Sequence, residues 1–327
     1  ALAEVRAEGA SPGFDFVQIG TQPETGASWA PSHSLRRMLR DAAELEDRDR
    51  FARLEAIHGR LIAAPVLVST IASADEKIFH FRTGGTLIVD EASQLHECQL
   101  LTVLAACRRV ILIGDQKQLP PVHEISLSPE MLPGIVSEIG FAGRPGASIM
   151  ERVWRLFAHR GWSHAFSTLK VQYRMHEDIE RFPNGQYYRN MLRCGLDRQR
   201  LQEFPVHRNL PELDENDDRA LLVNRLKRCR RLWIDVAATG ERAQREKEND
   251  AVMDILSLLH REGLTMGVVM PFRMQIQRLR NSLGRHFHER GEPVPESIRV
   301  DTVERFQGGQ RDVVIIATGI CDAQALD

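Results

Sequence analysis

Residues 86–93, TLIVDEAS, carry an apolar run that ends in two adjacent carboxylates, Asp90 and Glu91. Further along, residues 110–122, VILIGDQKQLPPV, repeat the arrangement with a second apolar run that ends in Gly114 and Asp115. Short apolar runs bounded by turn residues are typical of strands in a parallel sheet, and here they predict strands buried on both faces. Ligands of open α/β sheets bind outside the carboxyl ends of the strands. The two polar turns therefore predict a binding site.

The rest of the chain supports an α/β fold, because strand-like runs alternate with helical patterns. The other runs are FVQIG (16–20), PVLVST (65–70), RLWIDV (231–236), MGVVMP (266–271), IRVDT (298–302) and DVVIIAT (312–318). Residues 31–60 have helical spacing and predict a surface helical insertion, with a solvated connecting helix as the alternative. Residues 148–161 predict a helix with Ser148 at its N-cap. We expect a loop with a short helix over 122–147 and an irregular surface excursion over 205–230.

Two adjacent carboxylates at a strand end are costly unless a positive group meets them. In nucleotide hydrolases that group is Mg²⁺ on the β- and γ-phosphates. Asp90 would then orient the metal shell, and Glu91 would hold the attacking water. The alternative is an acidic helix N-terminus, where Asp and Glu are favoured. Gln118 carries a neutral amide that can sense a γ-phosphate, or it is a polar group of a surface turn.

Composition narrows the class of protein. Hydrophobic residues make up 43% and charged residues 27%, the balance of a globular protein, and the formal net charge is −2. Proteins that only bind duplex nucleic acid usually have an excess of basic residues, and this chain has none. The five cysteines form no CxxC pair, which predicts a reducing compartment, cytoplasmic or, in a eukaryote, nuclear. The longest charge-free stretch, residues 61–74, is too short and too rich in Ser and Thr to span a bilayer.

Taken together, the motifs resemble a known family. DEASQ (90–94), GDQKQLPPV (114–122), LKVQYRMHEDIERFPNGQYY (169–188) and VDTVERFQGGQRDVVII (300–316) follow the motif order of superfamily 1 helicases of the 5′-to-3′ branch. That family includes the nonsense-mediated-decay RNA helicase and the flap-processing helicase–nuclease. The resemblance covers residues 64–120, 148–192 and 248–318. It implies two RecA-like parallel-sheet domains, 1–161 and 162–327, with a nucleotide cleft between them.

The resemblance also implies roles for single residues. Asp90 resembles the acid that holds Mg²⁺, mostly through water, and Glu91 resembles the catalytic base. Gln118 is similar to the γ-phosphate sensor, with Asp115 near it. These assignments imply ATP and Mg²⁺ as ligands.

The second half of the chain carries the remaining nucleotide positions of the family. Tyr173 resembles the residue that stacks on adenine, and Arg174 resembles an arginine finger, with a salt-bridged surface arginine as the alternative. Gly308 resembles the loop that approaches the phosphates. Gln310 stands where the family usually has a Glu that holds the ribose, so sugar discrimination could be weaker here.

Ser69, Thr70 and Thr302 resemble positions that touch the backbone of single-stranded nucleic acid. Their alternative role is local, as strand-end hydroxyls that satisfy nearby backbone groups. The expected track is single-stranded DNA or RNA, and no membrane is expected as a partner.

The sequence holds no GxxxxGK[ST] phosphate loop and ends before the family's last arginine motif. We therefore expect a fragment of a longer motor, and we expect residues 1–327 alone to lack ATPase activity stimulated by nucleic acid. A rival hypothesis is a helicase-like scaffold that binds nucleic acid without turnover. A nuclease that uses Asp90 and Glu91 as metal ligands is a weaker third reading, because no further carboxylates stand at nuclease spacing.

Overall fold

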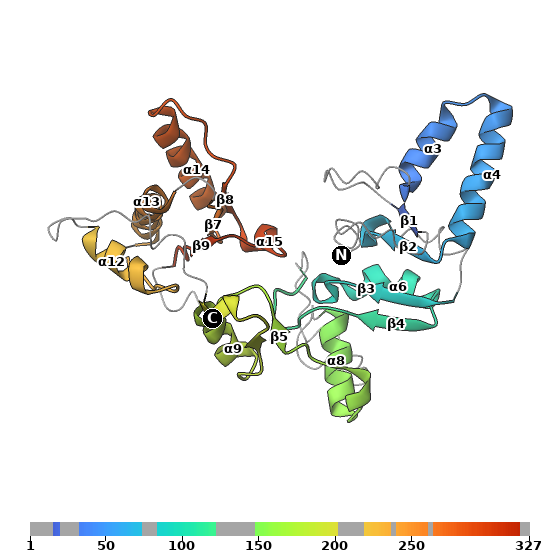
Figure 1. Ribbon diagram of the computed structural model, residues 1–327, viewed down its shortest axis with the longest axis horizontal. Coiled ribbons are helices and arrows are strands. Elements are labelled where there is room, and N and C mark those ends of the chain that lie inside the picture. Colours follow the sequence, from blue (N-terminus) through green and yellow to red (C-terminus); the bar gives the residue numbers. More distant parts are fainter. Residues whose placement is uncertain are drawn as a thin grey trace. The chain divides into compact units, whose positions relative to one another are not determined.

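The computed structural model describes residues 16–19, 33–73, 84–121, 148–201, 219–236, 240–260 and 264–320. It has an α/β fold in which helices alternate along the chain with strands, and the strands form small parallel sheets (Figure 1). The chain divides into two compact units, Ala1–Ser167 and Thr168–Asp327. The boundary expected from the sequence, after Gly161, falls a few residues before this division. That each unit is a RecA-like domain stays a prediction.

The first unit is built around two pairs of parallel strands. Its elements are β1 (Phe16–Ile19), α3 (Leu35–Ala43), α4 (Asp47–Ala63), β2 (Val66–Ser69), η1 (Ile71–Ser73), β3 (Thr86–Val89), η2 (Ala92–Gln94), α6 (Glu97–Ala105), β4 (Arg109–Leu112), α8 (Ile149–His159) and η4 (Ser163–Ala165). Strand β1 pairs with β2, and β3 pairs with β4. All four strands lie where the apolar runs predicted them.

Helices α3 and α4 connect β1 to β2, as Figure 1 shows. Parallel strands need such a crossover connection. Met38 and Ala42 of α3 pack with Val17 of β1, whereas α4 buries only Ile57. The helical prediction is confirmed over Leu35–Ala43 and Asp47–Ala63, and the pair forms the connection between two paired strands, which was the alternative interpretation.

Helix α8 begins where the sequence indicated. The Ser148 hydroxyl accepts a hydrogen bond from the backbone N–H of Glu151, at 3.2 Å, and so satisfies one of the free donors of the first turn. Ile149 of α8 packs with Val89 of β3 and Leu100 of α6 in one core cluster. This cluster fixes the β3–β4 sheet against its helices.

The second unit has a sheet of three parallel strands with β7 in the centre. Its elements are β5 (Val171–Gln172), α9 (Glu177–Tyr187), β6 (Arg193–Cys194), α10 (Arg198–Leu201), α12 (Ala220–Arg228), α13 (Glu241–Leu259), β7 (Met266–Val269), α14 (Arg273–His288), β8 (Ile298–Asp301), α15 (Val303–Phe306) and β9 (Val313–Ile316). Strand β7 pairs with β8 and β9, and β5 pairs with β6.

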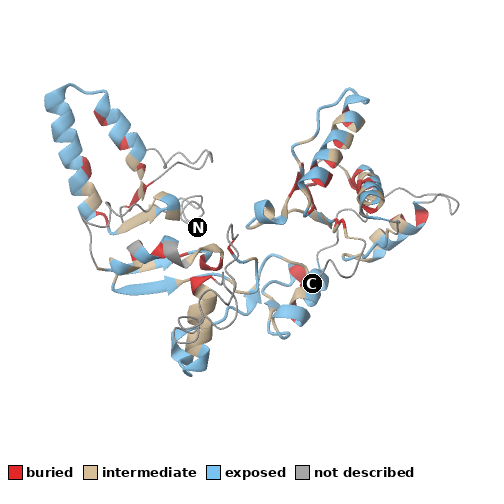
Figure 2. Cartoon of the chain, turned by 180° about the vertical axis from the view of Figure 1, so that it is seen from behind, coloured by how far each residue is buried: buried red, intermediate tan, exposed pale blue. Residues whose placement is uncertain are grey.

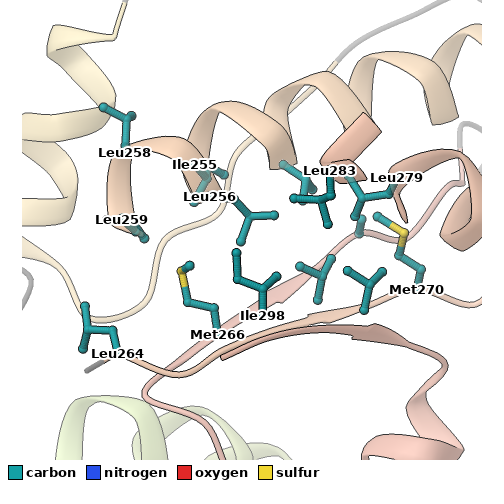
Figure 3. Packing of buried hydrophobic residues seen from close by; sticks show 14 of the residues in the cluster. Ile255, Leu256, Leu258, Leu259, Leu264, Met266, Met270, Leu279, Leu283 and Ile298 are labelled. Atoms are coloured by element: carbon teal, nitrogen blue, oxygen red, sulfur yellow. The ribbon is translucent and has the colours of Figure 1, made fainter. Parts of the chain in front are cut away.

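Helices α13 and α14 supply most of the core that covers this sheet. Figure 3 shows Leu256 and Leu279 pointing from these helices toward Met266, Met270 and Ile298 on or beside the strands. Helix α12 adds Val223, which is 1% exposed. Buried positions gather where helices meet strands (Figure 2).

Two sequence expectations for the second unit were wrong. Residues 231–236, expected as a strand, pair with no strand among the described residues, and Trp233 is 84% exposed. A strand needs a neighbouring strand to satisfy its backbone groups, and in the described part of the chain no strand pairs with this segment, although Gln244 Nε2 donates to the Val236 carbonyl. Within the expected irregular excursion, α12 is a regular helix, because Leu222, Val223 and Leu226 lie at helical spacing and pack on the core.

The expectation of strands buried on both faces was also wrong. Ile88 in β3 is 63% exposed and Ile316 in β9 is 72% exposed. Side chains alternate between the two faces of a strand, and in β3 only Leu87 and Val89 reach the core cluster. In β3 and β9 a continuous apolar run therefore does not mean that both faces are covered, whereas β7 is buried along most of its length.

The expected loop and short helix at 122–147 lie outside the described residues. Among the described helices, none is long and apolar enough to cross a membrane. Cys107, Cys194 and Cys229 are free thiols.

Candidate functional site

The two polar turns found in the sequence lie together at one edge of the β3–β4 pair. Val89 lies opposite Leu112 in the parallel register, so both strands end at the same edge. Beyond the strands, the backbone N–H of Ala92 donates to the carbonyl of Ile113 at 2.8 Å. The structure thus brings the Asp90–Glu91 turn beside the turn that begins at Gly114.

The acidic turn has an unusual backbone. Glu91 has φ of 52°, in the left-handed region that is uncommon for residues other than glycine. Its N–H donates to Asp90 Oδ1 at 3.0 Å, and Glu91 Oε2 accepts from Gln94 Nε2 at 2.8 Å. Both side chains are exposed. Strain of this kind gathers at functional sites, so the geometry favours a functional reading over a simple helix N-terminus.

The second turn folds around the carboxylate of Asp115. Its Oδ1 accepts from the Lys117 N–H at 2.9 Å, and its Oδ2 accepts from Gln118 Nε2 at 3.2 Å. The N–H of Asp115 donates to Ser93 Oγ at 3.4 Å, which links the two turns. Ser93 is 2% exposed. It is a linking residue that sequence reasoning missed, although it lies inside the DEAS motif.

Gly114 is required where the two turns approach. An added Cβ would stand 2.8 Å from Met150 Sδ and 3.0 Å from the backbone nitrogen of Ser93. We expect Gly114→Ala to lower the free energy of unfolding by about 1–3 kcal/mol, the cost of an overpacked contact. Denaturant unfolding measures it.

Gly59→Ala is the matched control for that substitution. Gly59 lies inside α4 with open space around its Cβ position. Alanine there should stabilise the protein by about 0.5–1 kcal/mol. Equal effects of the two substitutions would contradict the close approach at Gly114.

In the second unit, Tyr173 and Arg174 lie in the turn between β5 and α9. Both are exposed, and Tyr173 is 63% exposed. Within the described part of the chain, no carboxylate lies within ion-pair distance of Arg174, which argues against the salt-bridged alternative. Its backbone N–H donates to Gln172 Oε1 at 2.9 Å. The guanidinium therefore has no ion-pair partner among the described residues.

Gly195 makes room for the Tyr173 ring. A Cβ at this position would overlap the Cε1, Cζ and Cδ1 atoms of the ring. The ring of Tyr173 therefore lies directly against the backbone at Gly195. Sequence reasoning missed Gly195, because only the β5–β6 pairing brings it beside Tyr173.

Thr302, Gly308 and Gln310 lie between β8 and β9. Thr302 immediately precedes α15. A hydrogen bond from the Thr302 hydroxyl lowers the pKa of the Glu304 carboxyl, and a smaller contribution in the same direction comes from a hydrogen bond with the backbone of Glu304 itself. Gly308 has φ of 76°, and space is open around its Cβ position. Gln310 is exposed. The buried Gln307 Nε2 has no hydrogen-bond partner among the described residues.

Ser69 is the last residue of β2 and Thr70 follows it, and local hydrogen bonds use both hydroxyls. Ser69 Oγ donates to the Thr70 carbonyl at 2.8 Å, and Thr70 Oγ1 donates to Ser73 Oγ at 2.9 Å. This is the alternative role considered for them. A hydroxyl can accept as well as donate, so contact with nucleic acid stays a prediction.

Sequence reasoning also missed Glu248 of α13, which holds the chain where it leaves β9. Glu248 Oε2 accepts from the Gly319 N–H at 2.7 Å and from Gln275 Nε2 at 3.0 Å. Thr318 Oγ1 donates to the other oxygen at 3.3 Å. No motif marked this residue, because its partners lie far along the chain.

The donor set in the first unit fits Mg²⁺ in one specific way. No group of three or more His, Cys, Asp or Glu side chains that could hold a metal occurs among the described residues. Mg²⁺ at phosphate-transfer sites uses one or two carboxylates, water and substrate phosphates, so it needs no such cage. Asp90, an exposed carboxylate at a strand end, suits that mode.

Two family models match two separate segments of this chain. A model of an AAA domain, AAA_12, matches residues 146–320, and a second AAA-domain model, AAA_11, matches residues 29–124. The chain is 26% identical over 273 residues to an uncharacterized ATP-dependent helicase of Methanocaldococcus jannaschii, covering 80% of this chain and 36% of that protein.

Two other known proteins are similar to this chain. The probable helicase senataxin of Homo sapiens is 28% identical over 253 residues, which cover 70% of this chain and 8% of that protein. Regulator of nonsense transcripts 1 of Caenorhabditis elegans is 26% identical over 293 residues, which cover 84% of this chain and 24% of that protein. The chain thus spans a minor part of each relative. With the AAA_12 model matching more than half of it, the chain belongs to the AAA-domain family of superfamily 1 helicases of the senataxin and nonsense-transcript-regulator type.

Proposed function

We propose that this chain is the motor portion of an ATP-dependent helicase that moves along single-stranded DNA or RNA, 5′ to 3′. The observation that carries the proposal is the β3–β4 edge, where the turns of Asp90–Glu91 and Asp115–Gln118 are hydrogen-bonded together. Nucleotide hydrolases place such groups at the carboxyl ends of their strands. The relatives that are named as helicases support the same function.

Each unit contributes half of the proposed nucleotide site. We propose that the two units are RecA-like domains and that ATP binds in a cleft between them. Asp90 would hold Mg²⁺, mostly through water, and the cation would supply positive charge to the phosphate oxygens. Glu91 would orient a water molecule and take its proton, while Gln118, with its amide held by Asp115, would sense the γ-phosphate.

The second unit would supply the adenine contact and the transition-state charge. The exposed ring of Tyr173 would stack on adenine, and the guanidinium of Arg174, which makes no ion pair with the described residues, would meet charge spread over the phosphoryl oxygens. Gly308, free of side-chain bulk, would let the β8–β9 loop approach the phosphates. Gln310 would hydrogen-bond the ribose.

The protein would bind the sugar-phosphate backbone of the single-stranded nucleic acid. Ser69, Thr70 and Thr302 are the proposed contacts, each at the end of a parallel strand. Such contacts read no sequence. Binding should weaken as salt rises to the extent that basic residues neutralise phosphates of the strand. Closing and opening of the cleft would move the two units along the strand.

The full-length parent tests this proposal. Its ATPase activity should rise when single-stranded DNA or RNA is added, and its affinity for the strand should fall with salt concentration. A full-length protein that binds single strands yet shows no stimulated ATPase would support the scaffold hypothesis instead.

A further inference from the structure

The turn that carries Tyr173 and Arg174 rests on buried polar side chains. Glu180 is 4% exposed, Gln199 is 4% exposed and Asn184 is 8% exposed. They come from α9 and α10, and none belongs to the nucleotide positions assigned above. Burying a carboxylate and two amides is costly unless every polar atom is paired.

Gln172 joins these side chains to the turn. Its Oε1 accepts from the N–H groups of Arg174, at 2.9 Å, and Met175, at 2.7 Å. Its Nε2 donates to the Met175 carbonyl at 2.8 Å and to Glu180 Oε2 at 3.0 Å. The turn therefore folds around the amide of the residue that precedes Tyr173.

Glu180 determines which way that amide points. An ionised carboxylate only accepts hydrogen bonds, so it requires the NH₂ end of Gln172 and leaves the oxygen facing the turn. Its other partners are also donors: Asn184 Nδ2 at 2.8 Å and Cys194 Sγ at 3.2 Å. Burial, and then the carboxylate, raise the pKa of the Cys194 thiol, which keeps it a donor.

Gln199 ties the same turn to the segment beneath Tyr173. Its Oε1 accepts from the N–H groups of Gly195, at 3.0 Å, and Leu196, at 2.9 Å. Its Nε2 donates to the Met175 carbonyl at 2.9 Å. One side chain thus fixes the backbone on both sides of the aromatic ring.

We propose that Glu180 and Gln199 are positioning residues, which fix the Tyr173–Arg174 turn in the geometry needed for hydrolysis. Glu180 acts through Gln172. Gln199 acts through the Met175 carbonyl and through Gln172 Oε1, which lies 3.2 Å from its Nε2. The catalytic part of this proposal rests on the proposed function of Arg174. An arginine that stabilises a transition state must be preorganised, and Arg174 makes no ion pair in the described residues that could hold it. Among the described residues, Arg174 is held through its backbone N–H, which donates to Gln172 Oε1.

Two substitutions in the full-length protein test the proposal. Glu180→Gln keeps the shape but can present an NH₂ group to Gln172, and Gln199→Glu keeps the acceptors while losing the donor to Met175. Amide hydrogen exchange of the 172–176 segment should become faster by on the order of tenfold, the effect of losing one hydrogen bond. The turnover number, kcat, should fall by up to about 100-fold, since small displacements of a reacting group can cost that much.

Glu177→Gln is the matched control. Glu177 lies on the same helix with its side chain 48% exposed and only a 3.6 Å ion pair to Arg200. It should change neither exchange nor kcat. If Glu180→Gln does not fold, which a melting curve shows, Gln199→Glu carries the test.

A double-mutant cycle with Arg174→Ala separates positioning from general stability. The fall in kcat caused by Glu180→Gln should be lost when Arg174 is already absent. An equal fall in both backgrounds, or unchanged exchange in the 172–176 segment, would overturn the proposal. If Arg174→Ala leaves kcat unchanged while exchange still rises, the role of Arg174 and the catalytic part of the proposal fail, and the structural hold on the turn stands.

Discussion

Glu91→Gln in the full-length protein is expected to lower kcat for ATP hydrolysis by about 10²–10⁴-fold, the usual contribution of a general base. Gln keeps the length and shape of Glu, and its amide oxygen can still accept from Gln94, whose Nε2 now lies 2.8 Å from Glu91 Oε2. The substitution removes only the ability to take a proton. Affinity for nucleotide should therefore stay near that of the wild type. Steady-state ATPase assays and equilibrium nucleotide binding measure the two quantities.

Glu55→Gln is the matched control, because Glu55 is an exposed residue on α4 in the same unit. It should leave kcat unchanged. Binding of single strands should survive in both variants, whereas translocation should be lost only with Glu91→Gln. Wild-type turnover by the Glu91→Gln protein would remove Glu91 from the reaction, and Asp90 or Asp115 would have to be considered instead.

The closeness of the two polar turns in the first unit could be predicted from sequence because it depends on local patterns. Two apolar runs followed by polar turns predict neighbouring strands, and the β3–β4 pairing places Asp90 and Asp115 at one edge. Strand ends are set within a few residues by the change from apolar to polar. The N-cap of α8 was predicted for the same reason, since Ser148 bonds to a residue three positions away.

The buried polar side chains that hold the Tyr173–Arg174 turn could not be predicted in that way. Gln172, Cys194 and Gln199 meet because β5 pairs with β6, and no spacing along the chain signals that pairing. Glu180 lies on α9 among charged neighbours in the sequence, and such a charged stretch predicts a surface position. Only the fold shows that it is buried.

Packing also decided the cases in which local pattern failed. RLWIDV has the composition of a strand, but strands are stabilised by a partner, and among the described residues no strand pairs with it. Residues 220–228 lie in a polar stretch, yet Val223 docks on the core of the second unit and the segment is helical. Local propensity is a weak guide where tertiary contacts compete with it.

Arg174→Ala in the full-length protein should have the largest effect, a fall in kcat of about 10³–10⁵-fold, the usual contribution of an arginine finger. The structure leaves the guanidinium without an ion-pair partner in the described residues, so removing it breaks no salt bridge there. The loss should therefore be seen in turnover and not in the melting temperature. Arg174→Lys should recover only part of the rate, because lysine keeps the charge and lacks the planar fork of donors.

Arg181→Ala is the matched control for this loss of charge. Arg181 lies on α9, its side chain is 68% exposed, and its partner is Asp178 at 3.8 Å. Exposed pairs of this kind contribute little, so kcat and single-strand binding should stay near wild type. If Arg174→Ala and Arg181→Ala lower kcat equally, the effect is one of general surface charge and the arginine-finger role is wrong. If neither changes kcat and the wild type hydrolyses ATP, another residue must neutralise the transition-state charge.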